Sequence, residues 1–214
     1  MSQGSGHTLY SIGHSNRTLD EFLDLLRLHS IAVVADVRSS PYTRYATWFG
    51  REQIAAALGR AGISYIFLGK ELGARPDDRT CYEGGRVDFH KAAARDAFQA
   101  GLKRITAELQ KHNVAVMCAE KDPILCHRVI LVSRNLRSLC PTIKHITADG
   151  GVEDNAAMER RLMVELGVGG TLFDAQTPVE ELIERAYDMQ GRNIAYRPGA
   201  DEEAAPEPLR KGAD

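Results

Sequence analysis

The sequence predicts a three-layer, Rossmann-like α/β fold, in which a mainly parallel sheet of about five strands lies between two layers of helices. The main observation is alternation, because short β-rich runs take turns with segments of helical periodicity through most of the 214 residues. A second observation is the run IAVVADVR at 31–38, whose continuous apolar start is typical of a strand covered on both faces. Ligands bind beyond the carboxyl ends of the strands in such folds, so we look for function there.

The first half of the chain contains three strands and two helices. The helix from Thr18 to Leu28 shows the clearest start, because Thr18 can cap it and Glu21, three residues on, completes a capping box. The other elements expected are a strand over 8–12, a strand over 31–38, a helix over 51–61 that ends at Gly62, and a strand over 64–69.

In the second half, residues 70–88 are rich in glycine and charge, and we expect them to form a long loop. Asp122-Pro123 is typical of a helix start, with aspartate as the cap and proline in the first turn. The elements expected are helices over 89–112, 122–139, 155–166 and 178–190 and strands over 114–120 and 142–147.

We expect one domain over residues 8–195, with flexible termini at 1–7 and 196–214, because a chain of this length forms one core and the tail is rich in Ala, Pro and Glu. The composition is 43% hydrophobic and 26% charged, as in soluble globular proteins. A secretory leader and a membrane-length apolar run are not expected, and four cysteines do not suggest a disulfide framework. A cytoplasmic location with reduced thiols is therefore predicted.

The net charge of the chain indicates which binding partners to expect. A net charge of −2 does not indicate nucleic-acid binding, although a local basic patch would be compatible with it. An anionic small molecule or a nucleotide is the partner expected, without a membrane and without a cofactor, and the sequence does not indicate an oligomeric state.

The segment CAEKDPILCHR, residues 118–128, is the strongest candidate site. A strand is expected to end at Cys118 and Glu120, and Cys126 is expected about one turn into the next helix, where the helix dipole, His127 and Arg128 would favour a thiolate. Cys126 is then a candidate nucleophile, with His127 or Glu120 moving protons. The alternative is that both cysteines only fill space in the core.

Two familiar chemistries fit the spacing of this segment poorly. Structural zinc sites show closely spaced cysteine pairs, whereas seven residues separate Cys118 from Cys126. In addition, neighbouring residues on a helix point about 100° apart, which argues against one ion between Cys126 and His127. We therefore expect no metal ligand. A phosphatase loop would need arginine six residues after its cysteine, where this chain has Ile124 or Val132. A Cys118–Cys126 disulfide across the turn is a further alternative.

The segment DVRSSPYTRY, residues 36–45, supplies arginines at the next strand end. Arg38, Arg44 and Arg128 could converge on one anionic group, because guanidinium groups bind phosphate and carboxylate through paired hydrogen bonds. The alternative is that Asp36 and Arg38 pair with each other or with neighbours. His14, in Gly13-His14-Ser15, is either a base that faces the ligand or an ordinary turn histidine.

The chain also resembles a known family. The segments YSIGHSNRTLDEFLDLL, IAVVADVRSSPYTRYATWF, GISYIFLGKELG and VAVMCAEKDPILCHR resemble, in this order, the bacterial and archaeal domain of unknown function family numbered 488. The resemblance covers residues 8–148 and continues more loosely over a helical extension, 149–195. It implies a small α/β fold and a shared polar centre but no reaction, and where the family often has LGG this chain has Leu72-Gly73-Ala74, which suggests a stiffer backbone. The positions that the resemblance implies for the centre are His14, Asp36, Arg38, Pro41, Gly73, Cys118, Glu120, Cys126, His127 and Arg128.

Three functional hypotheses follow. The first is an enzyme that acts on an anionic small molecule or a nucleotide-derived substrate through a Cys-His-Arg centre at the carboxyl edge of the sheet. The second is a binding module that recognises a nucleotide or nucleic acid without chemistry. The third is a metal-binding or thiol redox protein.

Overall fold

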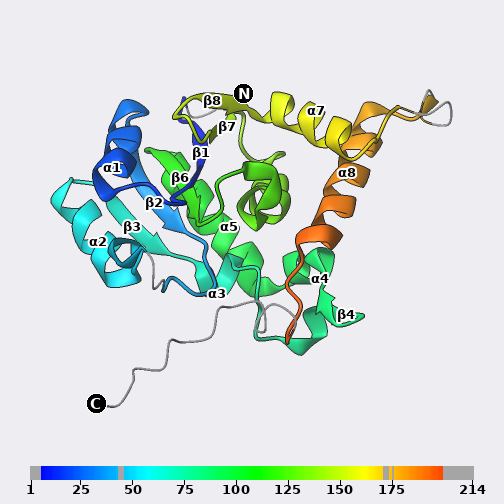
Figure 1. The fold of residues 1–214 in the computed structure, drawn as a ribbon, viewed down its shortest axis with the longest axis horizontal. Helices are drawn as coiled ribbons and strands as arrows, with labels where there is room; N and C mark the ends of the chain where they lie inside the picture. The colour runs from blue at the N-terminus through cyan, green and yellow to red at the C-terminus, as the bar shows by residue number, and fades with distance from the viewer. Residues whose placement is uncertain (1–5, 43–45, 171–173, 175, 200–214) are drawn as a thin grey trace, which may run out of the picture.

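The structure is a computed structural model that describes residues 6–42, 46–170, 174 and 176–199 (Figure 1). Its centre is a six-stranded sheet in the order β3-β2-β6-β1-β7-β8. The strands are β1 (Leu9–Gly13), β2 (Ile31–Asp36), β3 (Ser64–Phe67), β6 (Asn113–Cys118), β7 (Ile143–Ile146) and β8 (Val152–Asp154). The first five in that order run parallel, and β8 pairs antiparallel with β7. The predicted α/β fold is confirmed, and β8 is a short edge strand that the sequence analysis missed.

Helices cover both faces of this sheet (Figure 1). On one face α1 (Leu19–Leu28) and α2 (Arg51–Arg60) share an apolar cluster with Val34 of β2. On the other face α5 (Asp96–Leu109), α7 (Asn155–Glu165) and α8 (Val179–Ile194) share a larger cluster with Val33 and Ala35 of the same strand. Successive residues of β2 thus pack on opposite faces, which explains the continuous apolar run.

Helix α1 begins as predicted. The Thr18 side chain accepts a hydrogen bond from the Glu21 backbone N–H, and the Glu21 carboxylate accepts one from the Thr18 backbone N–H. This capping box satisfies two N–H groups that would otherwise have no partner at the start of the helix.

The segment expected to be a long loop, residues 70–88, carries short elements of its own. They are α3 (Gly69–Leu72), the 3-10 turn η2 (Arg79–Cys81), β4 (Tyr82–Glu83) and β5 (Arg86–Val87). Gly84 and Gly85, with φ of 55° and 75°, form the tight turn between β4 and β5, where two successive positive φ angles favour glycine. Strands of two residues are too short to show periodicity, so they could not be predicted from the sequence.

The single helix expected over 89–112 is two helices, α4 (Phe89–Ala94) and α5, so that prediction is wrong. Arg95 between them has extended backbone, with φ −65° and ψ 140°. Its guanidinium donates hydrogen bonds to the carbonyls of Ala92 and Glu71 and so stabilises the break. A polar residue at this position also suits an unbroken helix, so periodicity did not reveal the interruption.

The helix expected over 122–139 is also interrupted. Asp122 caps a 3-10 turn, η3 (Pro123–Leu125), and Cys126 then has extended backbone, with φ −134° and ψ 137°. A π-helical segment, η4 (Arg128–Ser133), and the short α6 (Arg134–Leu136) follow. Asp-Pro was therefore a correct start signal for a different element, and the extended residue Cys126 lies within the candidate site.

At the carboxyl end of the described chain, the backbone N–H of Val87 donates to the carbonyl of Tyr196. The expectation of flexible termini falls largely on residues 1–5 and 200–214, which lie outside the described residues. Among the helices that the structure describes, none combines the length and apolar character needed to cross a bilayer.

Candidate functional site

The carboxyl ends of three neighbouring strands bring the predicted site segments together. In the paired register, Gly13 of β1 lies beside Cys118 of β6, and Asp36 of β2 lies beside Met117 of β6. The chain leaves β1 through His14, whose backbone N–H donates to the Cys118 carbonyl at 2.9 Å. The GHS, DVR and CAE segments therefore meet at the centre of one sheet edge, as expected for parallel strands.

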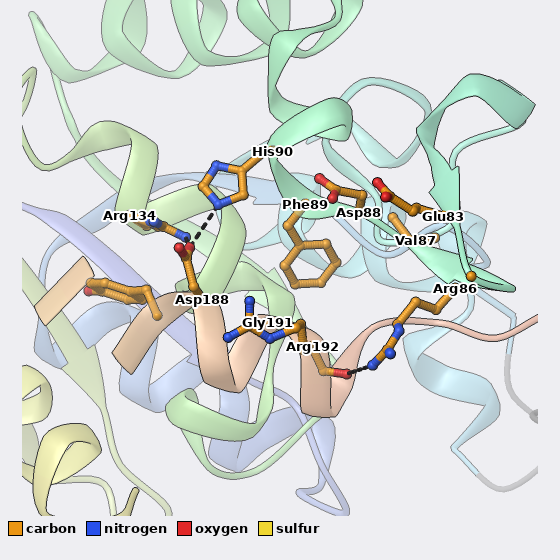
Figure 2. Close-up of a pocket in the computed structure, with 12 residues that line it drawn as sticks. Glu83, Arg86, Val87, Asp88, Phe89, His90, Arg134, Asp188, Gly191 and Arg192 are labelled. Atoms are coloured by element: carbon orange, nitrogen blue, oxygen red, sulfur yellow. Dashed lines mark hydrogen bonds and ion pairs between the residues drawn. The ribbon is translucent and has the colours of Figure 1, made fainter. Parts of the chain in front are cut away.

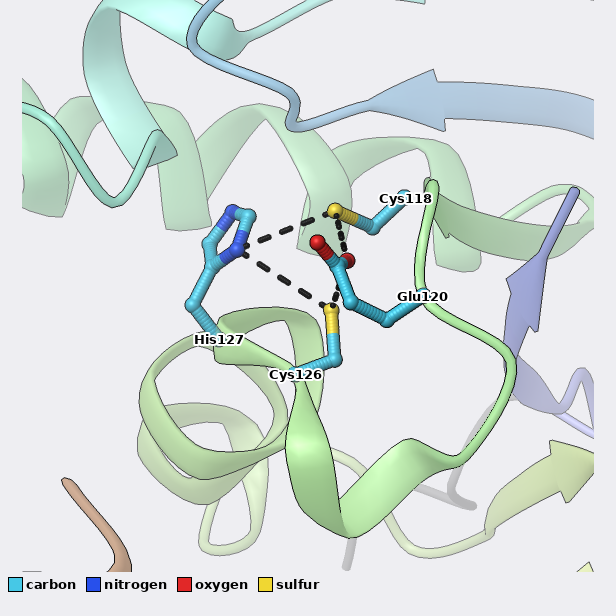
Figure 3. Close-up of side chains that lie close together, drawn as sticks. All are labelled: Cys118, Glu120, Cys126 and His127. Atoms are coloured by element: carbon cyan, nitrogen blue, oxygen red, sulfur yellow. Dashed lines mark hydrogen bonds between the residues drawn. The ribbon is translucent and has the colours of Figure 1, made fainter. Parts of the chain in front are cut away.

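Four side chains at this edge form what we call the cysteine cluster, namely Cys118, Glu120, Cys126 and His127 (Figure 3). Glu120 Oε2 lies 2.9 Å from both sulfur atoms, and His127 Nδ1 lies 3.7 Å from Cys118 Sγ and 4.0 Å from Cys126 Sγ. One ligand atom from each residue lies within 4.8 Å of those of the other three, so the cluster could hold a metal ion.

The local backbone explains how adjacent residues reach one point. Because Cys126 is extended rather than helical, its side chain and that of His127 are not held 100° apart on a helix surface. The geometric argument against a shared ion therefore does not hold. Asp122 contributes by capping η3 through a 3.1 Å hydrogen bond from the Ile124 backbone N–H, which turns the chain back toward Cys118.

Each ring nitrogen of His127 has a defined direction. Nε2 lies 3.0 Å from the carbonyl oxygen of Val37, and since a carbonyl only accepts, Nε2 carries the proton. In the neutral ring Nδ1 then presents its lone pair to the two sulfur atoms. The Val37 carbonyl thereby orients the imidazole toward the cluster.

Burial and neighbouring charges shift the pKa values of the two thiols in opposite directions. Burial, together with the hydrogen bond to Cys126 and the charges of Cys126 and Glu120, raises the pKa of Cys118 well above its ordinary value. Burial acts in the same direction on Cys126, but the hydrogen bond from Cys118 and the charges of Arg128 and His127 outweigh it and hold the pKa of Cys126 well below its ordinary value. Burial, and then the charge of Cys126, raises the pKa of Glu120. The first thiolate of the pair therefore forms on Cys126.

Arg128 supports the cluster from inside the protein. Its side chain is fully buried, and Nη1 and Nη2 donate to the carbonyls of Glu120 and Lys121 at 2.7 and 3.4 Å. Its backbone N–H points at Cys126 Sγ at 3.4 Å. The guanidinium was expected to hold an anionic ligand, but here it fixes the loop that carries Glu120.

The second group at this edge centres on Asp36 and Arg38. Arg38 Nε and Nη2 donate to the two carboxylate oxygens of Asp36 at 2.9 and 2.6 Å, and the Tyr65 hydroxyl donates to the same carboxylate at 2.8 Å. The alternative in which Asp36 and Arg38 pair is thus what the structure contains. This leaves the remaining N–H groups of Arg38 for other partners.

His14 belongs to this second group. Its Nε2 lies 3.1 Å from Arg38 Nη1, its Nδ1 lies 3.0 Å from the Ser15 carbonyl, and its ring stacks on Phe49. Burial, and then the charge of Arg38, lowers the pKa of His14 to about 4. The neutral ring donates from Nδ1 and accepts at Nε2, so His14 positions Arg38 and has no free nitrogen to act as a base.

A cleft of about 380 Å³ opens between the two groups. Cys118, Glu120 and His127 line it, whereas Cys126 does not, and both cysteines are buried, with 3% and 1% of their surfaces exposed. The cleft is also lined by Arg38, Ser39, Ser40, Tyr42, Arg75 and Tyr196. The sequence analysis missed both Arg75, which lies two residues after Gly73 in the segment expected to be a loop, and Tyr196, which follows α8 and is far along the chain from any strand end.

The remaining predicted residues support this edge from outside the cleft. The Pro41 carbonyl accepts a hydrogen bond from the Arg51 backbone N–H at the start of α2. A Cβ atom on Gly73 would lie 2.2 Å from the Gly69 carbonyl and 2.4 Å from Ser39 Oγ, so glycine is required for this close approach. Arg44 lies outside the described residues.

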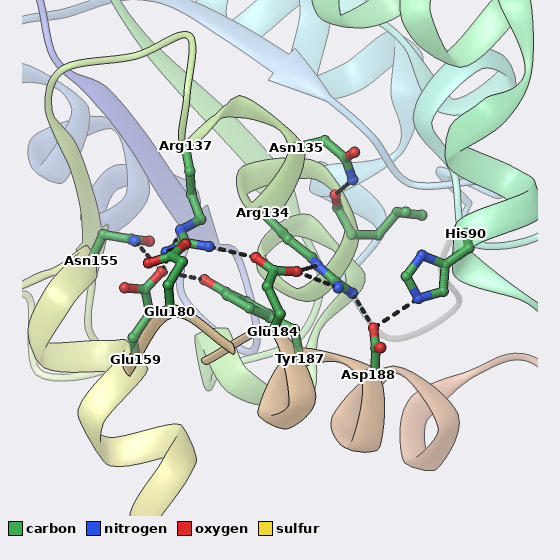
Figure 4. Close-up of polar contacts among 11 residues, drawn as sticks. His90, Arg134, Asn135, Arg137, Asn155, Glu159, Glu180, Glu184, Tyr187 and Asp188 are labelled. Carbon is green, nitrogen blue, oxygen red and sulfur yellow. Dashed lines mark hydrogen bonds and ion pairs between the residues drawn. The ribbon is translucent and has the colours of Figure 1, made fainter. Parts of the chain in front are cut away.

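A separate polar network ties α8 to the rest of the fold (Figure 4). Asp188 of α8 lies 2.7 Å from Arg134 and 2.8 Å from His90, and Arg137 lies 2.8 Å from Glu159 of α7. A pocket of about 320 Å³ opens beside His90, Arg134 and Asp188 (Figure 2). Because these charged groups pair with one another, we assign the network a structural role and place the candidate site at the sheet edge.

Comparison with known proteins adds a family. The model of the family described as domain of unknown function DUF488 matches residues 18–135, more than half of the chain. No curated protein and no solved structure matches the chain.

Proposed function

Because the chain belongs to the DUF488 family, whose description assigns no activity, we propose from the site itself that the protein is an enzyme for a small anionic substrate. The observation that carries this proposal is that Cys118, Glu120 and His127 line the same cleft as Arg38 and Arg75. Proton-transferring and nucleophilic groups thus share one cleft with cationic groups, as a catalytic cleft requires.

The arginines that line the cleft support an anionic substrate. Arg75 is exposed, and its guanidinium lies 4.3 Å from the centre of the Tyr196 ring, which orients it at the cleft. The Ser39 hydroxyl accepts a hydrogen bond from the Arg75 backbone N–H at 3.0 Å, so its own proton can point to a ligand. Charge-assisted hydrogen bonds of this kind hold phosphate and carboxylate groups.

The dimensions and aromatic content suggest a nucleotide-sized ligand. The volume of about 380 Å³ lies at the lower end of the range for small-molecule sites, about 300–1,000 Å³. Tyr42 is 74% exposed at the rim of the cleft, where its ring could stack on a base. We therefore favour a nucleoside phosphate or a molecule of similar size.

The reacting groups are assigned by position. Cys118, 3% exposed, lines the cleft, and Cys126, 1% exposed and not a lining residue, is the group that takes up negative charge. Glu120 lines the cleft in contact with both sulfur atoms and can move a proton to or from a substrate.

Calorimetric titration of inorganic phosphate, pyrophosphate and adenosine monophosphate into the full chain tests the anion site. We expect Arg75→Ala to weaken binding by about 10-fold or more, because a charge-assisted hydrogen bond contributes about 1.5–3 kcal/mol. Arg60→Ala, at an exposed arginine on α2, is the matched control and should bind normally. Failure of all three anions to bind, or equal binding by Arg75→Ala, would refute the proposal.

Mass-spectrometric alkylation separates an enzyme site from a binding module in which the thiols only pack. A bound anion should slow iodoacetamide labelling of Cys118 and leave that of Cys140, a buried cysteine outside the cleft, unchanged. Equal protection of both cysteines would mean that the anion acts on overall stability rather than at the thiols.

A further inference from the structure

We propose that the cysteine cluster binds one zinc ion, with Cys118, Cys126 and His127 as permanent ligands and Glu120 as an exchangeable fourth ligand. The binding of zinc stands on the cluster itself, and only its use in catalysis rests on the proposed function. Neither the family description nor the spacing of the sequence assigns a metal here.

The separations of His127 Nδ1 from the two sulfur atoms are close to those of a tetrahedral zinc site. Zn–S bonds of about 2.3 Å and Zn–N bonds of about 2.0–2.1 Å at the tetrahedral angle place a sulfur and a nitrogen about 3.5 Å apart. His127 Nδ1 lies 3.7 and 4.0 Å from the two sulfur atoms. Glu120 Oε2 lies closer to both sulfur atoms, at 2.9 Å, and must retreat by about 0.6 Å to reach the same geometry.

Neighbouring hydrogen bonds already orient the donors, as they do around ligands in metal sites. The Val37 carbonyl accepts the Nε2 proton of His127, which leaves Nδ1 as the metal-binding atom. The Arg128 backbone N–H points at Cys126 Sγ, an interaction that stabilises a bound thiolate. The protein therefore holds the three permanent donors in position without requiring a large rearrangement.

Charge gives a further reason for a cation. A carboxylate oxygen in contact with two thiols is unfavourable once the thiols lose their protons, because three negative charges would then lie within 4.8 Å. A divalent ion at the centre converts this repulsion into attraction, and the two thiol protons leave to solvent as it binds. Two thiolates, one imidazole and one carboxylate form a donor set that suits zinc better than magnesium or calcium.

The position of the cluster distinguishes a working ion from a purely structural one. Three of its four residues line the cleft, and Glu120 lies on an exposed part of the chain after β6. Structural zinc sites are closed, whereas catalytic sites keep one position for water or substrate. Replacement of Glu120 by a substrate oxygen would put the anion beside the metal, in the cleft that Arg38 and Arg75 also line.

Metal analysis of the full chain, purified without a histidine tag, tests the inference. We expect about one zinc per chain, and Cys118→Ser, Cys126→Ser and His127→Gln should each weaken zinc binding in a chelator competition by at least about 100-fold. Glu120→Gln should weaken it less. Cys140→Ser is the matched control, since Cys140 is buried outside the cluster and should leave zinc affinity unchanged.

Cobalt substitution of the wild-type chain covers the case in which ligand variants fail to fold. Tetrahedral cobalt bound by thiolates should give visible d–d bands and near-ultraviolet charge-transfer bands. Absence of these bands, failure to bind zinc, or a Cys118–Cys126 disulfide in the native protein would overturn the inference. Arg75→Ala should bind zinc normally, so loss of metal binding with Arg75-dependent anion binding intact would remove this inference and leave the proposed function standing.

Discussion

Replacement of Gly13 by alanine should destabilise the fold and weaken zinc binding together. A Cβ atom at this position would lie 1.8 Å from the Glu120 carbonyl oxygen, whereas contacts below 3.0 Å are essentially never seen. The chain after β6 must therefore move by at least about 1.2 Å, and the same carbonyl holds the buried Arg128 guanidinium at 2.7 Å. The movement strains this contact and displaces the chain that joins Cys118 to Cys126, two of the proposed permanent zinc ligands.

We expect a loss of about 3 kcal/mol in the free energy of unfolding, since overpacking costs about 1–3 kcal/mol and a buried guanidinium loses part of its hydrogen bonding. Urea denaturation followed by circular dichroism measures this loss, and chelator competition should show zinc affinity lower by about 10- to 100-fold. Gly59→Ala on α2 is the matched control, because nothing lies within 4 Å of its Cβ, and it should raise stability by about 0.5–1 kcal/mol. A Gly13→Ala protein with wild-type stability and zinc affinity would refute the reasoning.

Two further predictions concern buried ionisable side chains. Burial lowers the pKa of His145 to about 4, so between pH 4 and about pH 6.5 the folded chain binds fewer protons there than the unfolded chain. The contribution of His145 to the free energy of unfolding is therefore fully present above about pH 6.5, and about 3 kcal/mol of it is lost as the pH falls toward 4. Urea denaturation across this range should show a correspondingly smaller loss for His145→Gln, and an unchanged pH dependence would contradict the assignment. Asp36→Asn should lower the free energy of unfolding by about 3–5 kcal/mol, because Arg38, only 5% exposed, would lose its counter-charge. Asp24→Asn, in an exposed ion pair, is its control and should have almost no effect in the same assay.

Local patterns were sufficient where an element depends on its own residues. The capping box of Thr18 and Glu21, the buried strand β2 and the Asp122 cap of η3 follow from short-range chemistry, and all three are present. Local patterns failed where tertiary contacts decided the backbone. Arg95 interrupts a helical segment because its guanidinium reaches the Glu71 carbonyl, which no window of neighbouring residues contains.

The sequence by itself determined the α/β class and the strand ends that carry polar residues, and it predicted a candidate site in the segment from Cys118 to Arg128. The tertiary structure decided how those residues lie relative to one another. Parallel pairing placed Gly13 beside Cys118, extended backbone at Cys126 let it converge with His127, and packing of the carboxyl-terminal segment placed Tyr196 in the lining of the cleft. The physical reason is that a site is defined by distances between side chains, and spacing along a chain predicts those distances only while the backbone remains regular.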